Sequence, residues 1–181
     1  MSFIGRIKSI YHRLLGDDNL AVVSPENLVL EECTSIGPKS RIMNLRARFV
    51  MKKYSFSGPE LLVVTGDHMP VLGIPTIKVS DAMKDQLDTE HRFDRDVIVE
   101  EDVWLGARVT LLSGVTVGRG CIVAAGSVVV NSIPPYHVAA GVPAKPVKLR
   151  YSADEIIEHE KKVYPENERF TREEIESFLS F

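Results

Sequence analysis

The chain has 181 residues, and its length suits one domain with appendages. Its formal net charge of −3 and pI near 6.0 argue against a nucleic-acid partner, because a nucleic-acid binder would carry a basic stripe. Two cysteines, Cys33 and Cys121, are too few for a disulfide framework or a zinc knuckle, so a reducing cytoplasm is the expected compartment.

Residues 1–20 are expected to contain a short amphipathic helix. Between Ser2 and Leu15, apolar residues recur at helical spacing with basic residues on the other face, and Gly16 would end the helix. We expect the apolar stripe to pack on the protein or on a neighbouring subunit, with contact to a membrane surface as the alternative. No stretch approaches the roughly 18 uninterrupted apolar residues of a membrane span, and the signal-peptide pattern is missing.

Residues 21–150 are predicted to form a β-helix of six-residue repeats. In the early part of this range, aliphatic residues recur at intervals of six: Leu30, Ile36 and Ile42. Arg46 then occupies the inward position four residues after Ile42, and Val99 lies sixty-three residues after Ile36, which is not a multiple of six. The repeat therefore loses its phase, and we predict an insertion between the early and late coils.

The predicted insertion covers residues 67–96, which are rich in Asp, Lys and Pro and show no stable period. Loops of this length are uncommon inside a compact domain unless they are functional, so we predict a loop that projects from the β-helix and borders an active site; disorder is the alternative. His68 opens this loop. A histidine there suits a general base, because imidazole is largely neutral at pH 7. His91, near the far end of the loop, is the second candidate.

From Val99 to Pro134 the six-residue period is continuous. Each unit begins with an aliphatic residue, and a small or aliphatic residue follows four places later: Val99 and Val103, Leu105 and Val109, Leu111 and Val115, Val117 and Cys121, Val123 and Ser127, Val129 and Ile133. Neither a helix nor an alternating strand gives a strict period of six, whereas hexapeptide repeats build a parallel β-helix with three units per turn. Both positions should therefore face the core, Cys121 included.

The proline-rich stretch from Pro134 to Pro146 is expected to end the coils. Residues 151–181 are predicted to form two helices separated by Pro165. Each helix would begin with a capping box, Ser152 to Glu155 and Thr171 to Glu174, in which a hydroxyl and a glutamate satisfy backbone N–H groups of the first turn.

Three motifs resemble the signature of hexapeptide-repeat acetyltransferases, a family that includes maltose, galactoside and serine acetyltransferases. They are Asp102-Val103-Trp104-Leu105-Gly106-Ala107, Ala124-Ala125-Gly126-Ser127-Val128-Val129 and Ala140-Gly141-Val142-Pro143-Ala144-Lys145. The long loop after His68 and the trailing helices are most similar to the xenobiotic branch, which acetylates streptogramin A and chloramphenicol, and to its relatives that act on sugars of surface polysaccharides. The resemblance covers residues 28–165.

The resemblance implies an all-β fold, a left-handed parallel β-helix, that assembles as a homotrimer with active sites between subunits. It makes His68 similar to the family's catalytic base, and it implies that Trp104 walls the acceptor or thioester pocket. Asp67, or another acidic residue of the insertion, is expected to orient the His68 imidazole, and Asp67 and Trp104 are the expected substrate contacts. The cosubstrate would be acetyl-CoA, and no metal is expected. The coenzyme contacts carried onto this chain are Ala107, Ala125, Val130, Asn131, Lys145 and Lys148. Family members often have Thr-Lys in place of Val130-Asn131, which puts one cationic contact to the coenzyme in question.

We therefore expect an acetyl-CoA-dependent O-acetyltransferase that acts on a sugar hydroxyl by direct general-base catalysis. The alternatives of the same class are O-acetylation of an antibiotic and N-acetylation of an amino sugar. Two alternatives belong to other classes. A γ-type carbonic anhydrase uses the same prism but needs a closely spaced histidine pair that this chain lacks. A non-catalytic β-helix scaffold would have no reason to combine small residues at the coenzyme edge with His68.

Overall fold

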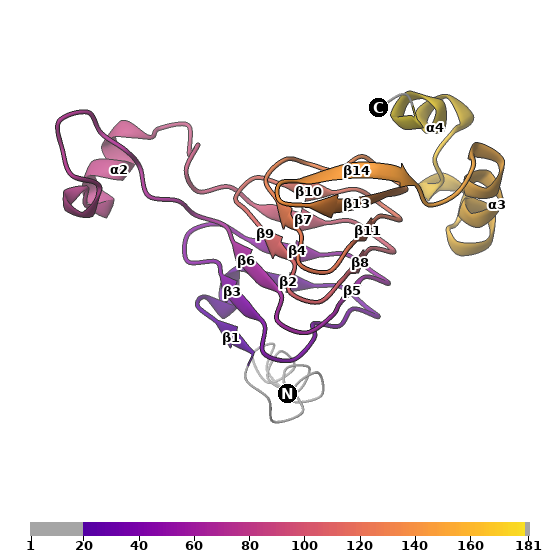
Figure 1. Cartoon of the computed structure of the whole chain (residues 1–181), viewed down its shortest axis with the longest axis horizontal. Helices are drawn as coiled ribbons and strands as arrows, with labels where there is room; N and C mark the ends of the chain where they lie inside the picture. The colour runs from indigo at the N-terminus through magenta and orange to yellow at the C-terminus, as the bar shows by residue number, and fades with distance from the viewer. Residues whose placement is uncertain (1–19, 180–181) are drawn as a thin grey trace.

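The computed structural model describes residues 20–179, and their centre is a triangular prism of stacked, mostly parallel strands (Figure 1). The chain winds through three sheets in turn, which we call faces A, B and C. Face A contains β1 (Ala21–Val22), β3 (Arg41–Met43), β6 (Leu62–Val64), β9 (Thr110–Leu111) and β12 (Val128–Val129). Face B contains β2 (Leu28–Leu30), β4 (Phe49–Met51), β7 (Val97–Val99) and β10 (Thr116–Val117). Face C contains β5 (Phe56–Ser57), β8 (Trp104–Leu105), β11 (Ile122–Val123), β13 (His137–Gly141) and β14 (Ala144–Leu149).

The late coils have the three-unit turn that the six-residue period predicts. Leu105 pairs with Val123, and Leu111 pairs with Val129, each one full turn of 18 residues later. The side chains at both repeat positions from Val99 to Ile133 are at most 3% exposed, and they form one continuous hydrophobic core. The parallel β-helix predicted from the repeat is therefore confirmed.

The lost phase has a different cause from the one that the sequence suggested. In the early coils, Ile42 pairs with Val63, which is 21 residues later rather than 18. The additional residues lie in the corner between β3 and β4, where the buried Asn44 side chain bonds to the backbone of Ser24. The long insertion adds thirty residues between Val63 and Leu111, a whole number of hexapeptides, so it leaves the phase unchanged.

Glycine is required at the corner between faces C and A because successive coils approach closely there. A Cβ on Gly106 would lie 2.5 Å from the backbone nitrogen of Ala125, and one on Gly58 would lie 2.7 Å from that of Ala107. Neither glycine is among the residues with positive φ. The restriction at this corner is therefore the space between coils, not the bend of the chain itself.

Residues 67–96 leave the prism between β6 and β7 and project well beyond it, and we call them the arm (Figure 1). The arm contains a 3-10 turn, η2 (Thr76–Lys78), and a short helix, α2 (Asp81–Leu87), which the sequence analysis did not expect. The Ser80 side chain caps α2 by accepting a hydrogen bond from the N–H of Met83. Serine followed by an acidic first turn is the signal that was missed.

The prediction that the coils end at Pro134 is wrong. Strand β13 continues face C in parallel with β11, and β14 then pairs with β13 as an antiparallel hairpin. Pro143 lies in the hairpin turn, after a cis Val142–Pro143 bond, and Pro146 lies in β14 beside a bulge. Because β14 is the edge strand of face C, Pro146 interrupts few ladder hydrogen bonds.

After the prism the chain forms α3 (Ala153–Val163), the turn η3 (Glu166–Glu168) and α4 (Arg172–Leu179). Both predicted capping boxes are present, one at Ser152 and one at Thr171. The two helices bury a second, smaller core against the prism, formed by Tyr136, Ile156, Ile175 and Phe178. Within residues 20–179, no helix is long and apolar enough to cross a membrane. The predicted N-terminal helix lies outside the described residues.

Candidate active site

Both ends of the arm are fastened at one point of the prism, next to the proposed base. The carbonyl of Thr65 accepts hydrogen bonds from the Ser113 hydroxyl (3.0 Å) and from the N–H of Arg95 (3.0 Å). The Ser113 hydroxyl in turn accepts from the N–H of Arg95 at 3.1 Å. The Thr65 hydroxyl, fully buried, donates to the carbonyl of Ala47. His68 therefore follows a rigid edge of the prism.

His68 itself is exposed at the root of the arm, and it has no hydrogen bond with any residue that the structure describes. The Asp67 side chain is also exposed and is not bonded to His68. Only the backbone of Asp67 is held, with its N–H donating to the carbonyl of Phe93 at 2.7 Å. His91, the second candidate base, is exposed in the turn that follows α2. A free imidazole at this position is open to an incoming hydroxyl group.

The proposed coenzyme edge lies at the corner between faces C and A. Ala107 and Ala125 occupy equivalent places in successive coils, and the N–H of Gly126 donates to the carbonyl of Ala107 at 2.8 Å. A Cβ on Gly126 would meet nothing within 4 Å. The corner is therefore smooth and open, with backbone groups close to the surface. A narrow amide-bearing chain such as pantetheine fits this kind of edge.

The other coenzyme candidates are divided between two places. Val130 and Asn131 are exposed in the corner after β12, between faces A and B, and this is the corner from which the arm also leaves. Lys145 and Lys148 are exposed on β14, at the edge of face C. The hairpin is attached near the coenzyme edge through Gly141, whose N–H donates to the Ser127 hydroxyl at 3.2 Å.

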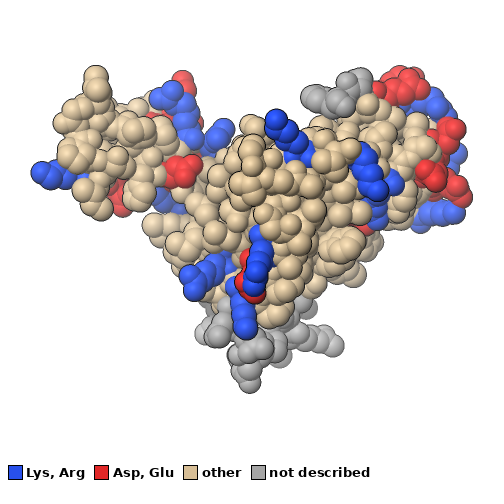
Figure 2. All heavy atoms as spheres, viewed as in Figure 1, with Lys and Arg blue, Asp and Glu red and all other residues tan. Residues whose placement is uncertain are grey.

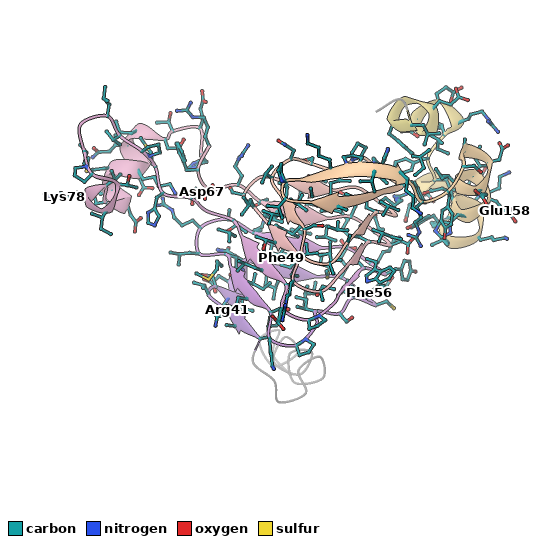
Figure 3. All side chains as sticks on the ribbon, in the orientation of Figure 1. Arg41, Phe49, Phe56, Asp67, Lys78 and Glu158 are labelled. Carbon is teal, nitrogen blue, oxygen red and sulfur yellow. The ribbon has the colours of Figure 1, made fainter. Side chains whose placement is uncertain are left out.

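Trp104 lies on the outer side of face C and is 47% exposed. Its ring stacks on that of Phe56 one coil below, with 6.0 Å between centroids and 15° between planes. Phe56 points away from the prism, whereas Phe49 lies inside it (Figure 3). Phe56 belongs to none of the sequence motifs, although its strand, β5, pairs with the strand of Trp104. Together the two rings form an exposed aromatic surface.

A single chain does not bring these predicted residues together. His68 follows β6 at the corner between faces A and B, whereas Ala107 and Ala125 lie at the corner between faces C and A. The whole width of face A separates the two corners. Trp104 belongs to a third place, the outer side of face C. One chain therefore contributes separate parts of a site rather than a complete one.

The structure describes no group of three or more His, Cys, Asp or Glu side chains between residues 20 and 179 that could hold a metal ion. Charged side chains of both signs gather on the C-terminal helices and on the arm, whereas those on the face of the prism turned to the viewer in Figure 2 are scattered and mostly Lys or Arg.

Cys121 is buried and points into the core, as predicted, with its thiol donating to the carbonyl of Pro134. Burial raises the pKa of the Cys121 thiol to about 12, which leaves almost no thiolate at neutral pH. Cys33 is free and exposed. We expect iodoacetamide at pH 8 to modify Cys33 and to spare Cys121 in the folded protein, as read by mass spectrometry of peptides. Equal labelling of both thiols would contradict the burial of Cys121.

Comparison with solved structures defines the class of fold. A maltose O-acetyltransferase from Clostridium difficile 630 superposes with a TM-score of 0.63 at 21% identity, covering 83% of this chain and 78% of that chain. A hexapeptide-repeat-containing acetyltransferase from Vibrio cholerae O1 biovar eltor, solved with acetyl coenzyme A, gives a TM-score of 0.62 at 19% identity. That match covers 84% of this chain and 81% of the other. At these identities the likeness concerns the fold.

Sequence comparison identifies the repeat. Residues 96–131 match the family model described as bacterial transferase hexapeptide (six repeats). A probable macrolide acetyltransferase from Lysinibacillus sphaericus is 45% identical over 64 residues, which are 35% of this chain and 36% of that protein. Residues 96–131 are thus hexapeptide repeats of the kind found in bacterial transferases, and the resemblance stated from the motifs is confirmed for this repeat. The chain spans between 27% and 36% of the length of the first curated relatives that it matches.

Proposed function

We propose that this protein is an acetyl-CoA-dependent O-acetyltransferase. The observation that carries the proposal is the combination of a smooth coenzyme edge with a free histidine on a rigid corner of the same prism. Acetyl coenzyme A is present in the Vibrio cholerae structure with the related fold, which supports the choice of cosubstrate. The proposal includes a left-handed β-helix, which the family resemblance implies. It also includes a cytoplasmic location, which suits a protein with two free cysteines.

The proposed reaction needs no covalent enzyme intermediate. The His68 imidazole removes the proton from an acceptor hydroxyl while that oxygen attacks the thioester carbonyl of acetyl-CoA. A backbone N–H at the coenzyme edge stabilises the oxyanion that forms. When the C–S bond breaks, the imidazolium returns its proton to the coenzyme A thiolate, which leaves an ester and free coenzyme A.

The positions of the two corners support a homotrimer with shared active sites. Face A separates His68 from the coenzyme edge in one chain, so the site is completed when a neighbouring copy brings its own edge to His68. We expect light scattering on purified protein to give the mass of three chains. A monomer that still turns over acetyl-CoA at the full rate would refute this arrangement.

We assign the pantetheine chain of the coenzyme to Ala107 and Ala125, with Lys148 and Lys145 near the nucleotide. Val130 and Asn131 lie at the other corner of face A, so we assign their contact to the coenzyme held by a neighbouring copy. We expect Lys145→Ala to weaken coenzyme A binding by about 1 to 3 kcal/mol, as for a lost charge-assisted hydrogen bond to phosphate. Calorimetric titration with coenzyme A measures this loss. Identical affinities for the variant and the parent protein would mean that Lys145 is a solvated surface lysine.

We propose a carbohydrate hydroxyl as the acceptor, with Asp67 and Trp104 on the acceptor side. The polar arm supplies many hydrogen-bonding groups, and an exposed aromatic surface such as the Trp104–Phe56 pair suits the apolar face of a sugar ring. An antibiotic is the second candidate. The name of the Lysinibacillus sphaericus relative and the exposed apolar side chains of Leu72 and Ile77 on the arm favour it.

The test is an acetyl-CoA consumption assay with nucleotide sugars, simple glycosides, chloramphenicol, a streptogramin A and a macrolide side by side. We expect turnover with at least one sugar and weak or no turnover with the antibiotics. Efficient turnover of an antibiotic with the sugars inert would overturn the acceptor proposal and leave acetyl transfer intact. A product acetylated on nitrogen would replace O-acetylation. If acetyl-CoA is not consumed with any of these acceptors, the result would contradict the proposal that the protein is an acetyltransferase.

A further inference from the structure

A buried lysine lies at the root of the arm, in contact with the residue that precedes the proposed base. Lys84 belongs to α2 and is 8% exposed, although lysine is almost never buried without a partner. Its ammonium donates to the carbonyl oxygen of Asp67 at 2.7 Å and pairs with the Asp94 carboxylate at 2.8 Å. Lys84 thus connects helix α2 to the two chain segments at the root of the arm, one at Asp67 and one at Asp94.

Asp94 is the second half of this cluster, and its carboxylate is also nearly buried. The Arg46 guanidinium pairs with it at 3.3 Å from the enlarged corner between β3 and β4. Gly66 forms an isolated bridge with Asp94, and a Cβ on Gly66 would lie 2.4 Å from the Asp94 carboxylate oxygen. Glycine at position 66 is therefore what allows the carboxylate to approach the chain immediately before Asp67.

We infer that Lys84 is a positioning residue that sets the place of His68 through the carbonyl of Asp67. This inference rests on the proposed role of His68 as the base. Because the His68 side chain has no hydrogen bond with the described residues, its place depends on the backbone that carries it. Two contacts hold the adjacent residue, Asp67: its N–H donates to the carbonyl of Phe93, and its C=O accepts from Lys84.

The energetic consequence is larger for catalysis than for folding. The cluster lies where the arm meets the prism, outside the hydrophobic core that the coils form. Loss of the Lys84 contact therefore frees the segment around His68 and leaves the stacked coils intact. A displacement of about 1 Å at a reacting group can cost on the order of 10²-fold in rate. A purely structural role would change the thermal stability without a selective effect on kcat.

The test compares Lys84→Met, which keeps the length of the side chain and removes its donor, with Lys84→Arg, which keeps the charge. Lys78→Met is the matched control, because Lys78 is exposed on the same arm and lies at its far end (Figure 3). The measurements are kcat and KM for acetyl-CoA, the thermal midpoint, and hydrogen exchange of the peptide that covers residues 65–69.

For Lys84→Met we expect kcat to fall about 10- to 100-fold with an unchanged KM for acetyl-CoA. The peptide 65–69 should exchange faster while the coils and the thermal midpoint stay unchanged. Lys84→Arg should recover most of kcat, and Lys78→Met should behave as the parent protein. Unchanged kcat and unchanged exchange in Lys84→Met would overturn the inference, as would a lowered thermal midpoint with no selective fall in kcat. If the parent protein transfers no acetyl group, the proposed function fails, and exchange of the peptide 65–69 alone decides whether Lys84 holds this segment.

Discussion

Replacement of His68 by alanine should lower kcat by about 10² to 10⁴-fold, the range for loss of a general base, and should leave the affinity for acetyl-CoA nearly unchanged. The coenzyme edge lies at another corner of the prism, and the His68 side chain makes no hydrogen bond that its loss would break among the described residues. The fall in kcat would therefore report proton transfer rather than folding. Steady-state kinetics with acetyl-CoA and the accepted sugar measure it.

His91→Ala is the matched control. His91 is also an exposed histidine of the arm, but it lies in the turn after α2, away from the rigid edge at Thr65. We expect its loss to change kcat by less than about tenfold, since it has no assigned role in proton transfer. If His91→Ala removes activity and His68→Ala does not, the base is misassigned.

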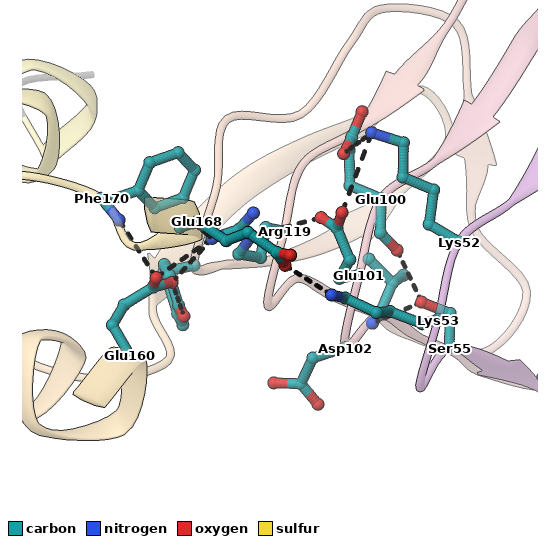
Figure 4. A network of polar contacts seen from close by, with 12 residues as sticks. Lys52, Lys53, Ser55, Glu100, Glu101, Asp102, Arg119, Glu160, Glu168 and Phe170 are labelled. Carbon is teal, nitrogen blue, oxygen red and sulfur yellow. Dashed lines mark hydrogen bonds and ion pairs between the residues drawn. The ribbon is translucent and has the colours of Figure 1, made fainter. Parts of the chain in front are cut away.

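The largest effect on stability is expected for Glu160→Ala, at about 3 to 5 kcal/mol. Glu160 is 1% exposed in α3, and Figure 4 shows it at the helix end of a polar network that continues through Arg119 to Glu101 of the prism. Its carboxylate accepts from the Tyr136 hydroxyl at 2.5 Å, from the Arg119 guanidinium at 3.0 Å and from the N–H of Phe170 at 3.1 Å. Without it, buried donors lose their acceptor, and the contact of α3 with the prism weakens.

Urea unfolding followed by near-UV circular dichroism measures this loss, and limited proteolysis shows whether residues 150–179 detach first. Glu158→Ala is the control, because Glu158 lies on the exposed side of α3 and, within residues 20–179, pairs only with Lys162, one helical turn away. We expect it to have little effect. Equal stability of Glu160→Ala and the parent protein would mean that the network does not fasten the helices to the prism.

The same network gives a direction for the dependence of stability on pH. Burial raises the pKa of Tyr136, and the nearby Glu160 carboxylate raises it further. Burial also raises the pKa of Tyr164. Folding therefore favours the neutral phenols. Their contribution is present below the unfolded pKa of tyrosine, about 10, and is lost as the pH rises above it.

The sequence predicts the prism well because its signal is local and repeated. Each leading residue, such as Leu105 or Val123, is followed six residues later by another that must face the same core, so the period alone determines which side chains are buried. The capping boxes at Ser152 and Thr171 are equally local. The strands after Pro134 could not be predicted in this way, because proline excludes an inner strand but not the edge position that β14 occupies.

The candidate site could be predicted only in part. Motif resemblance indicates His68 and the residues of the coenzyme edge, but the placement of His68 at one corner and Ala125 at another follows from the winding of the chain. Nothing in the sequence marks Lys84 as a site residue, because a lysine in a polar loop is expected to be solvated. Its contact with Asp67, 17 residues earlier, exists only because the arm folds back on its own root.

Because the acceptor is still a proposal, calorimetric titration with coenzyme A tests the central claim most directly. We expect saturable binding of one coenzyme A per chain, and we expect Ala125→Trp, which fills the coenzyme edge, to abolish this binding. Ala21→Trp, a change at an exposed alanine of β1 in the first described coil, should leave binding intact. No heat of binding with the parent protein, or equal affinity in Ala125→Trp, would contradict the assignment of this edge to coenzyme A.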